Sequence, residues 1–368
     1  MSNLIKRTAS AYDYPLLIKQ LFLAPLGNNP DQEIVYRDQL TLTYRSWKER
    51  VHRLANVLTS VGVVRGSTVA VMDWDSNRYL EAYYSVPMMG AVLHTINVRL
   101  SPEQLVYTIE HAEDDVIICH ADFVPLLEAI KGRISEGRKF ILIDEGTEVS
   151  RNHISFEGEY EKLLAEAAPE FNFPDFDENT RATTFYTTGT TGLPKGVYFS
   201  HRQLVLHTLS TTAALASPSV QGRLHSESVY MPLTPMFHVH AWGIPYIATF
   251  LGVKQVYPGK YVPLMLLKLL VAHQVTFSHC VPTILNMLLK EPDSASYDLS
   301  RWSCIIGGAI LPKALAIQAL NRGIDVFAGY GMSETCPVVA LSQLTEKDLE
   351  LSLEEQAELR CRTGRPIG

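Results

Sequence analysis

The chain has 368 residues, of which 46% are hydrophobic and 19% are charged, and its formal net charge at pH 7 is −7. This length and composition predict a folded globular protein with more than one core and exclude a disordered chain. The acidic balance argues against nucleic acid as the main partner, so an anionic ligand would need local donors.

The N-terminal residues and the cysteines favour a cytoplasmic location. Residues 1–20 carry four charged side chains and no continuous apolar core, unlike a signal peptide, and no apolar run is long enough to span a bilayer. The five cysteines are scattered and odd in number, which predicts free thiols in a reducing compartment. Peripheral membrane contact and a homodimer stay open.

Strands alternate with helices along most of the chain, which predicts parallel sheets covered on both faces. Residues 1–44 are expected to form an N-terminal extension with a helix at 16–23 and a hairpin of 34–36 with 40–43. Residues 45–179 are expected to form one α/β subdomain. Its predicted strands are 69–72, 90–96, 116–119 and 140–143, and its predicted helices are 47–61, 77–89, 101–111 and 123–131. The acid- and proline-rich stretch 144–180 is interpreted as a connection.

A second alternating series at residues 180–342 predicts a second α/β subdomain. Its predicted strands are 183–186, 228–233, 254–257, 276–280, 304–306 and 325–328, and its predicted helices are 241–252, 261–273, 282–290 and 312–321. Residues 343–368 are expected to form a helical tail. The predicted fold is therefore two doubly wound, mainly parallel sheets packed as subdomains.

One loop between these elements has the composition of a polyphosphate site. Residues 187–196 hold four threonines, three glycines, one proline and one lysine, and no apolar periodicity. Glycines with positive φ would let backbone N–H groups approach anionic oxygens, and Lys195 would add a mobile positive charge. Ser200 and Gln203 then predict a capping box that begins a helix.

The spacing differs from that of a Walker A loop, because Gly192 lies three residues before the lysine and Gly196 follows it. An NTPase that couples hydrolysis to motion stays a competing hypothesis, as does an ordinary surface turn.

A second candidate string, residues 329–335, follows a predicted strand. Ligands of open α/β sheets lie beyond the carboxyl ends of the strands. Tyr330 between two glycines offers a flat aromatic face for a nucleobase, and the Glu334 carboxylate is an oxygen ligand of the type that Mg²⁺ prefers. An ordinary strand-to-loop exit is the alternative interpretation of this string alone.

The first string, Tyr-Thr-Thr-Gly-Thr-Thr-Gly-Leu-Pro-Lys-Gly, resembles the signature of the AMP-binding, adenylate-forming superfamily of acyl-CoA synthetases, luciferases and peptide-synthetase adenylation domains. The second string is similar to that family's Tyr-Gly-x-[Ser/Thr]-Glu motif, and residues 307–309 resemble its segment along the adenylate. Residues 236–242, Met-Phe-His-Val-His-Ala-Trp, resemble the acyl-pocket motif of medium- and long-chain fatty acyl-CoA synthetases. The resemblance runs from about residue 30 to the end.

This resemblance implies ATP-dependent conversion of a fatty acid to acyl-AMP and its transfer to CoA, with ATP, CoA and Mg²⁺ as substrates and cofactor. It implies catalytic roles for Lys195, Glu334 and His238, metal binding by Thr187 and Glu334, and an acyl channel bordered by His238 and Trp242, the tryptophan as its gate. The implied nucleotide-binding residues are Thr187, Thr188, Gly189, Thr190, Thr191, Gly192, Lys195, Gly308, Ala309, Gly329, Tyr330, Gly331, Met332 and Ser333.

Four alternatives stay open. Another acid, aryl, branched or sulfur-containing, could replace the fatty acid, or the chain could be a non-catalytic nucleotide- or acyl-binding fragment. His238 and His240, two residues apart, would share one face of a strand and could be metal ligands, although no third ligand is evident nearby. Trp242 could simply be a core residue.

The sequence ends soon after Thr363-Gly364-Arg365-Pro366, which resembles the family's Thr-Gly-x-Pro segment. The later ribose-binding motif, the hinge, the C-terminal domain and most of the β-barrel subdomain have no counterpart here. We therefore expect a truncated form with impaired thioester formation.

Overall fold

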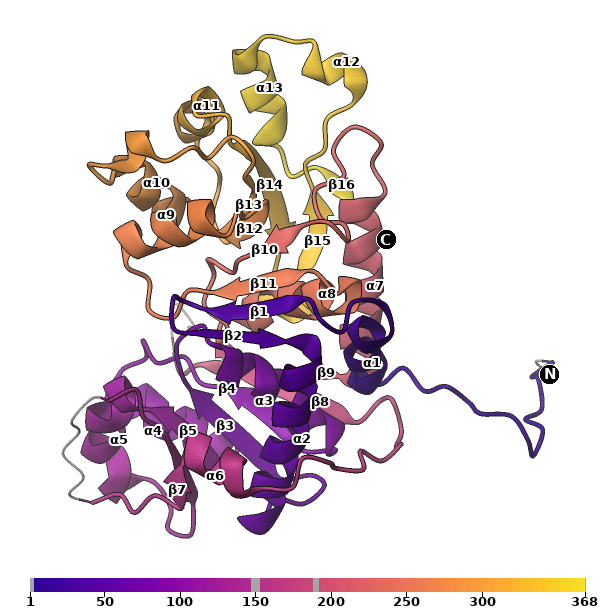
Figure 1. The fold of residues 1–368 in the computed structure, drawn as a ribbon, viewed down its shortest axis with the longest axis vertical. Helices are drawn as coiled ribbons and strands as arrows, with labels where there is room; N and C mark the ends of the chain where they lie inside the picture. Colours follow the sequence, from indigo (N-terminus) through magenta and orange to yellow (C-terminus); the bar gives the residue numbers. More distant parts are fainter. Residues whose placement is uncertain (1–2, 147–152, 188–191, 368) are drawn as a thin grey trace.

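The computed structural model describes residues 3–146, 153–187 and 192–367. They form a mixed α/β structure with two sheets, one in the lower half of Figure 1 and one in the upper half. The helices are α1 (Ile18–Asn28), α2 (Tyr44–Ser60), α3 (Asn77–Met88), α4 (Pro102–His111), α5 (Val124–Ile130), α6 (Tyr160–Glu166), α7 (His201–Ala216), α8 (Ile244–Leu251), α9 (Pro263–Ala272), α10 (Pro282–Lys290), α11 (Lys313–Asn321), α12 (Glu346–Leu349) and α13 (Leu353–Arg360).

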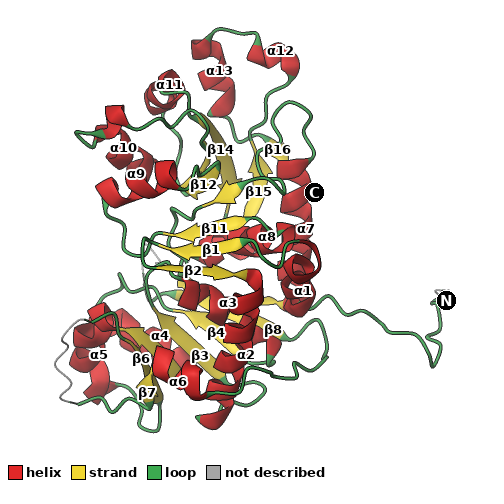
Figure 2. Ribbon diagram, in the orientation of Figure 1, coloured by secondary structure: helices red, strands yellow, loops and turns green. Residues whose placement is uncertain are grey.

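The strands follow the same alternation, and Figure 2 shows them in yellow between the helices. They are β1 (Glu33–Tyr36), β2 (Leu40–Thr43), β3 (Thr68–Met72), β4 (Val92–Thr95), β5 (Asp114–His120), β6 (Lys139–Ile143), β7 (Gly158–Glu159), β8 (Arg181–Thr187), β9 (Lys195–Ser200), β10 (Val229–Tyr230), β11 (Lys254–Tyr257), β12 (Phe277–Cys280), β13 (Ser303–Ile306), β14 (Asp325–Gly331), β15 (Val338–Leu341) and β16 (Arg365–Pro366). No helix of the described part of the chain combines the length and the apolar character that a bilayer crossing needs.

The lower sheet has seven strands in the order β7-β6-β5-β3-β4-β8-β9. All its pairs are parallel except the antiparallel pair β8–β9 at one edge. Strand β3 is buried along its whole length, as expected for a parallel strand covered on both faces. Its apolar side chains join those of α2, α3, α4 and α5 in one core.

The upper sheet has nine strands in the order β16-β15-β14-β13-β12-β10-β11-β1-β2, and its central pairs are parallel. Successive residues of β13 alternate between its faces. Cys304 and Ile306 pack in the core that contains α9, α10 and α11, whereas Ile305 packs in the core that contains α7 and α8. Helices therefore cover both faces, which confirms the predicted doubly wound architecture.

Strand pairing crosses the predicted subdomain boundaries. The hairpin β1–β2 joins the upper sheet beside β11 and is not a separate extension (Figure 1). Strands β8 and β9, expected in the second subdomain, extend the lower sheet next to β4. The connection at 144–180 also contains β7 and α6. Pairing between segments far apart in the chain leaves no local pattern in the sequence, and for that reason periodicity did not reveal it.

The C-terminal tail is fixed to the upper sheet by a buried charge cluster. Asp325, the first residue of β14, accepts hydrogen bonds from the guanidinium groups of Arg223 and Arg360. Burial alone would raise the pKa of Asp325, but the two arginines hold it at about 2. Because Arg360 is the last residue of α13, this cluster connects the tail to the strand that leads into residues 329–335.

Candidate functional site

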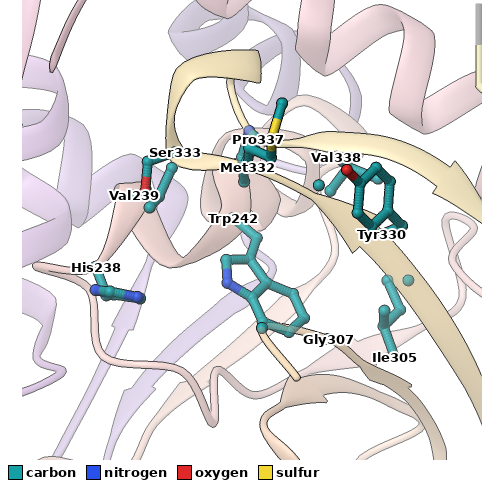
Figure 3. A pocket seen from close by; sticks show the side chains of 13 residues that line it. His238, Val239, Trp242, Ile305, Gly307, Tyr330, Met332, Ser333, Pro337 and Val338 are labelled. Atoms are coloured by element: carbon teal, nitrogen blue, oxygen red, sulfur yellow. The ribbon is translucent and has the colours of Figure 1, made fainter. Parts of the chain in front are cut away.

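Three segments singled out from the sequence line one cavity of about 250 Å³ (Figure 3). They are the segment with His238 and Trp242, the glycines after β13, and residues 329–333 at the end of β14. The complete lining is His238, Val239, Trp242, Ile305, Gly307, Gly308, Gly329, Tyr330, Gly331, Met332, Ser333, Pro337 and Val338. Segments that follow β10, β13 and β14 of the upper sheet therefore meet at the carboxyl ends of its parallel strands, where such sheets bind ligands.

The indole of Trp242 lies in the middle of this cavity, with its six-membered ring toward Gly307 (Figure 3). A Cβ atom built on Gly307 would lie 2.9 Å from the indole Cη2 and 2.9 Å from the carbonyl oxygen of Gly329. Any larger residue at 307 would therefore displace either the tryptophan or the neighbouring strand. Gly308, with φ of 71°, adopts the left-handed conformation that glycine tolerates best.

Trp242 is carried on a left-handed turn that the sequence did not reveal. Val239, His240, Ala241 and Trp242 have φ between 48° and 58°, and Gly243 follows with φ of 73°. Each non-glycine residue in this region costs roughly 1–2 kcal/mol, so surrounding contacts must hold the turn. One such contact precedes it, where the backbone N–H of Met236 donates to Asp75 at 2.8 Å.

The two histidines of this segment have different environments. His238 is exposed to the cavity, and partial desolvation together with the charge of Arg99 lowers its pKa. His240 is fully buried, and neither of its ring nitrogens has a hydrogen-bond partner among the described residues. The expectation that both share one strand face is wrong, because the turn sends them in different directions. No group of three or more His, Cys, Asp or Glu side chains that could hold a metal occurs in the described ranges.

Tyr330 lies between two cavities. Besides the first, it lines a second cavity of about 260 Å³ together with Gly308, Ala309 and Thr363. Its side chain is 47% exposed, so part of it is accessible to a ligand. Strand β14 continues through Tyr330 to Gly331, further than the predicted strand 325–328, and pairs there with β15. The tyrosine is thus held on a paired strand and not on a free loop.

The threonine- and glycine-rich loop connects β8 to β9, whose register pairs Thr187 with Lys195. Thr188, Gly189, Thr190 and Thr191 lie outside the described residues. Lys195 is exposed at the start of β9, and the predicted capping box of Ser200 and Gln203 is confirmed at the start of α7. Strands β8 and β9 therefore form an antiparallel pair, and β9 continues directly into α7.

Two glycines of this loop do not have the positive φ that the sequence analysis expected. No described residue lies within 4 Å of a Cβ atom built on Gly192, whereas a Cβ atom on Gly196 would lie 3.3 Å from the ring of Tyr186. Close packing against Tyr186 therefore explains why residue 196 is a glycine. Neither packing nor φ explains the glycine at residue 192.

Glu334 faces the hairpin side of the site. It is exposed and lines a groove together with Phe199 of β9, Gln203 and Ser210 of α7, and Thr335. The side-chain oxygens of Glu334 and Thr187 are of the hard type that Mg²⁺ prefers, and Mg²⁺ commonly uses one or two protein ligands plus phosphate oxygens and water. In donor type these two residues fit Mg²⁺.

Sequence reasoning missed several contributors to the first cavity. Ile305 was assigned to a strand, and Pro337 and Val338 to no element, yet all three line it. Val338 begins β15, which folds back on β14, and this pairing had no turn signature beyond Pro337. His279 of β12 packs behind Trp242 with 5.1 Å between ring centroids. The one sign of His279 in the sequence was the presence of a histidine in an apolar strand.

The model of the AMP-binding enzyme family matches residues 24–368. The chain is 40% identical over 328 residues to a long-chain-fatty-acid–CoA ligase of Thermus thermophilus, covering 88% of this chain and 58% of that protein. It is 36% identical over 359 residues to a 3-methylmercaptopropionyl-CoA ligase of Ruegeria lacuscaerulensis, covering 96% of this chain and 66% of that protein.

The fold is also similar to the crystal structure of the anthranilate CoA ligase AuaEII in complex with anthranoyl-AMP. The TM-score is 0.83 at 20% identity, over 96% of this chain and 65% of that one. The chain thus spans about three fifths to two thirds of the length of these proteins. The match of the family model over nearly the whole chain shows that it belongs to the AMP-binding enzyme family.

Proposed function

We propose that this chain forms the nucleotide- and acid-binding part of an acyl-CoA synthetase that converts a fatty acid and ATP to an acyl-adenylate and pyrophosphate. The adenylate is then transferred to CoA with release of AMP. The observation that carries the proposal is the cavity that places His238 and Trp242 beside Gly308 and residues 329–333. An acid and a nucleotide bound there would be in direct contact.

The chemistry explains the need for a nucleotide. A carboxylate is a poor electrophile, because attack on it would have to expel oxide. When the carboxylate oxygen attacks the α-phosphorus of ATP, a C–O–P bond forms, the bond to the β-phosphate oxygen breaks, and pyrophosphate leaves. The CoA thiol then attacks the acyl carbon and AMP departs. The protein mainly has to position the two substrates and meet the developing charge on phosphorus with fixed donors.

Each part of the site has a proposed share in this reaction. The hairpin tip at residues 187–195, with Lys195, binds the β- and γ-phosphates, and Ser333 binds the α-phosphate. Tyr330 stacks on the adenine, and Gly308 and Ala309 line the adenylate where a larger side chain would obstruct it. His238 and Trp242 border the acyl chain.

Glu334 and Thr187 would hold Mg²⁺, which supplies positive charge to the phosphate oxygens. The exposed carboxylate of Glu334 leaves room for water and phosphate ligands beside it.

A sulfur-containing acid is the second candidate substrate. It is favoured by the similarity to the Ruegeria lacuscaerulensis protein, whose name gives 3-methylmercaptopropionyl-CoA ligase. The fatty acid is favoured by the higher identity to the Thermus thermophilus protein.

The test is acid-dependent exchange of labelled pyrophosphate into ATP, with a panel of straight-chain fatty acids, 3-methylmercaptopropionate and aryl acids. We expect exchange with at least one aliphatic acid and none without acid. Phosphate release from ATP in the absence of any acid, with no exchange, would favour the NTPase hypothesis and overturn the proposal.

A further inference from the structure

His279 is a buried polar group with an unused nitrogen. Its side chain is fully buried, and its Nε2 atom lies 2.8 Å from the hydroxyl oxygen of Tyr230. Its Nδ1 atom has no hydrogen-bond partner among the described residues. Buried polar atoms are nearly always hydrogen-bonded in folded proteins, so an unpartnered one indicates a missing ligand, a water or strain.

His279 lies directly beside the cavity wall. In the sheet register it pairs with Ile305 of the adjacent strand, and paired residues of neighbouring strands project to the same face. Ile305 and Trp242 both line the cavity, and the indole packs against the His279 imidazole with 5.1 Å between ring centroids. Movement of the indole would therefore open the cavity toward the His279 imidazole.

The imidazole is also suited to a neutral partner. Burial lowers the pKa of His279 to about 3, so the ring is uncharged at neutral pH. A neutral imidazole can donate or accept a hydrogen bond at Nδ1, according to its tautomer. It offers no counter-charge to a second carboxylate, whose burial beside it would be costly.

We propose that the acid activated here carries a neutral hydrogen-bonding group, such as a hydroxyl or a carbonyl, along its aliphatic chain, and that Nδ1 of His279 binds this group. The inference rests on the proposed function and narrows its substrate class. A plain alkyl chain in the same place would leave the nitrogen unpartnered, and a site built to hydrogen-bond a substrate group rejects the analogue that lacks it.

The test uses acyl-sulfamoyl adenosines, stable mimics of an acyl-adenylate, in titration calorimetry with the 368-residue chain. The probes are an octanoyl compound, octanoyl compounds with one hydroxyl at successive carbons, and one with a terminal carboxylate. We expect one hydroxylated probe to bind at least tenfold more tightly than the octanoyl probe, and the carboxylate probe to bind most weakly.

Variants assign the preference to His279. His279→Leu should bind the octanoyl probe more tightly than the preferred hydroxylated probe. His279→Gln, which keeps hydrogen-bonding atoms, should retain part of the preference for the hydroxylated probe. His201→Leu is the matched control. His201 is also fully buried, and its Nε2 has no partner within the described part of the chain, but it packs against α1, where the backbone N–H of Ile18 donates to its Nδ1. This control should leave the ratio unchanged.

The outcomes separate the two proposals. If all the probes bind and the octanoyl probe binds as well as every hydroxylated one, or if His279→Leu leaves the ratio unchanged, the inference is overturned and the proposed function stands. If no probe binds at all, the proposed function fails and the inference fails with it.

Discussion

Gly331→Ala should disrupt the site through a backbone collision. A Cβ atom at residue 331 would lie 2.0 Å from the carbonyl oxygen of Pro337 and 2.7 Å from its carbonyl carbon. Both are backbone atoms, so no flexible side chain can yield. The same oxygen accepts hydrogen bonds from the backbone N–H of Met332 and the hydroxyl of Thr335, which hold the turn containing Ser333 and Glu334.

Overpacking a well-packed region costs about 1–3 kcal/mol. We expect the upper end here, about 3 kcal/mol, because β14 and β15 must separate; this is roughly a 150-fold change in the folding equilibrium. Urea unfolding would measure this loss, and titration calorimetry with ATP and Mg²⁺ should show weaker binding as the turn moves. Gly192→Ala is the control, since no described residue lies within 4 Å of the added atom and no positive φ is found for Gly192. That substitution should change stability by less than about 0.5 kcal/mol. Equal stability losses in the two variants, or an unperturbed Gly331→Ala, would refute the steric argument.

Three further predictions concern charged and titratable groups. Asp325→Asn should cost roughly 3–5 kcal/mol in urea unfolding, because it leaves two buried arginines without their counter-charge. The control Glu103→Gln, which breaks an exposed ion pair with Arg133, should change stability far less because solvent screens that pair, and equal losses would contradict the role of burial. Burial lowers the pKa of His240 to about 3, so folding excludes a proton that the unfolded chain binds below about pH 6.5, and stability falls as the pH drops through that value. The unfolding free energy of His240→Leu minus that of the native chain should therefore be about 2 kcal/mol larger at pH 5.0 than at pH 7.5. The same difference at both pH values would argue against a buried neutral ring. Glu334→Ala should reduce pyrophosphate exchange at least tenfold while fatty-acid binding, measured by calorimetry, stays within twofold; similar losses in both assays would count against metal binding by Glu334.

The sequence predicted those elements whose burial leaves a local pattern. Strand β3 is a continuous apolar run because both its faces are covered, and α2 has an apolar stripe at helical spacing. The capping box at Ser200 was predictable because it depends on two residues three positions apart. Such features are determined within a few residues of the chain.

Other features depend on partners that are distant in sequence. The left-handed turn that carries Trp242 contains four non-glycine residues with positive φ, so glycine content gave no sign of it. The extension of β14 to Gly331 exists because β15 pairs with it, and a Gly-Tyr-Gly string viewed alone is typical of a loop. The placement of His279 behind Trp242 results from sheet register, which no one-dimensional pattern contains.

The central claim is that an acid attacks the innermost phosphorus of ATP at this site. It is tested most directly by supplying ATP, Mg²⁺, CoA and a fatty acid labelled with ¹⁸O in its carboxylate, and by analysing the released AMP by mass spectrometry. The account predicts AMP that carries one ¹⁸O atom, because the attacking oxygen stays on phosphorus when the acyl carbon is transferred. Unlabelled AMP, or ADP and phosphate in place of AMP, would contradict it.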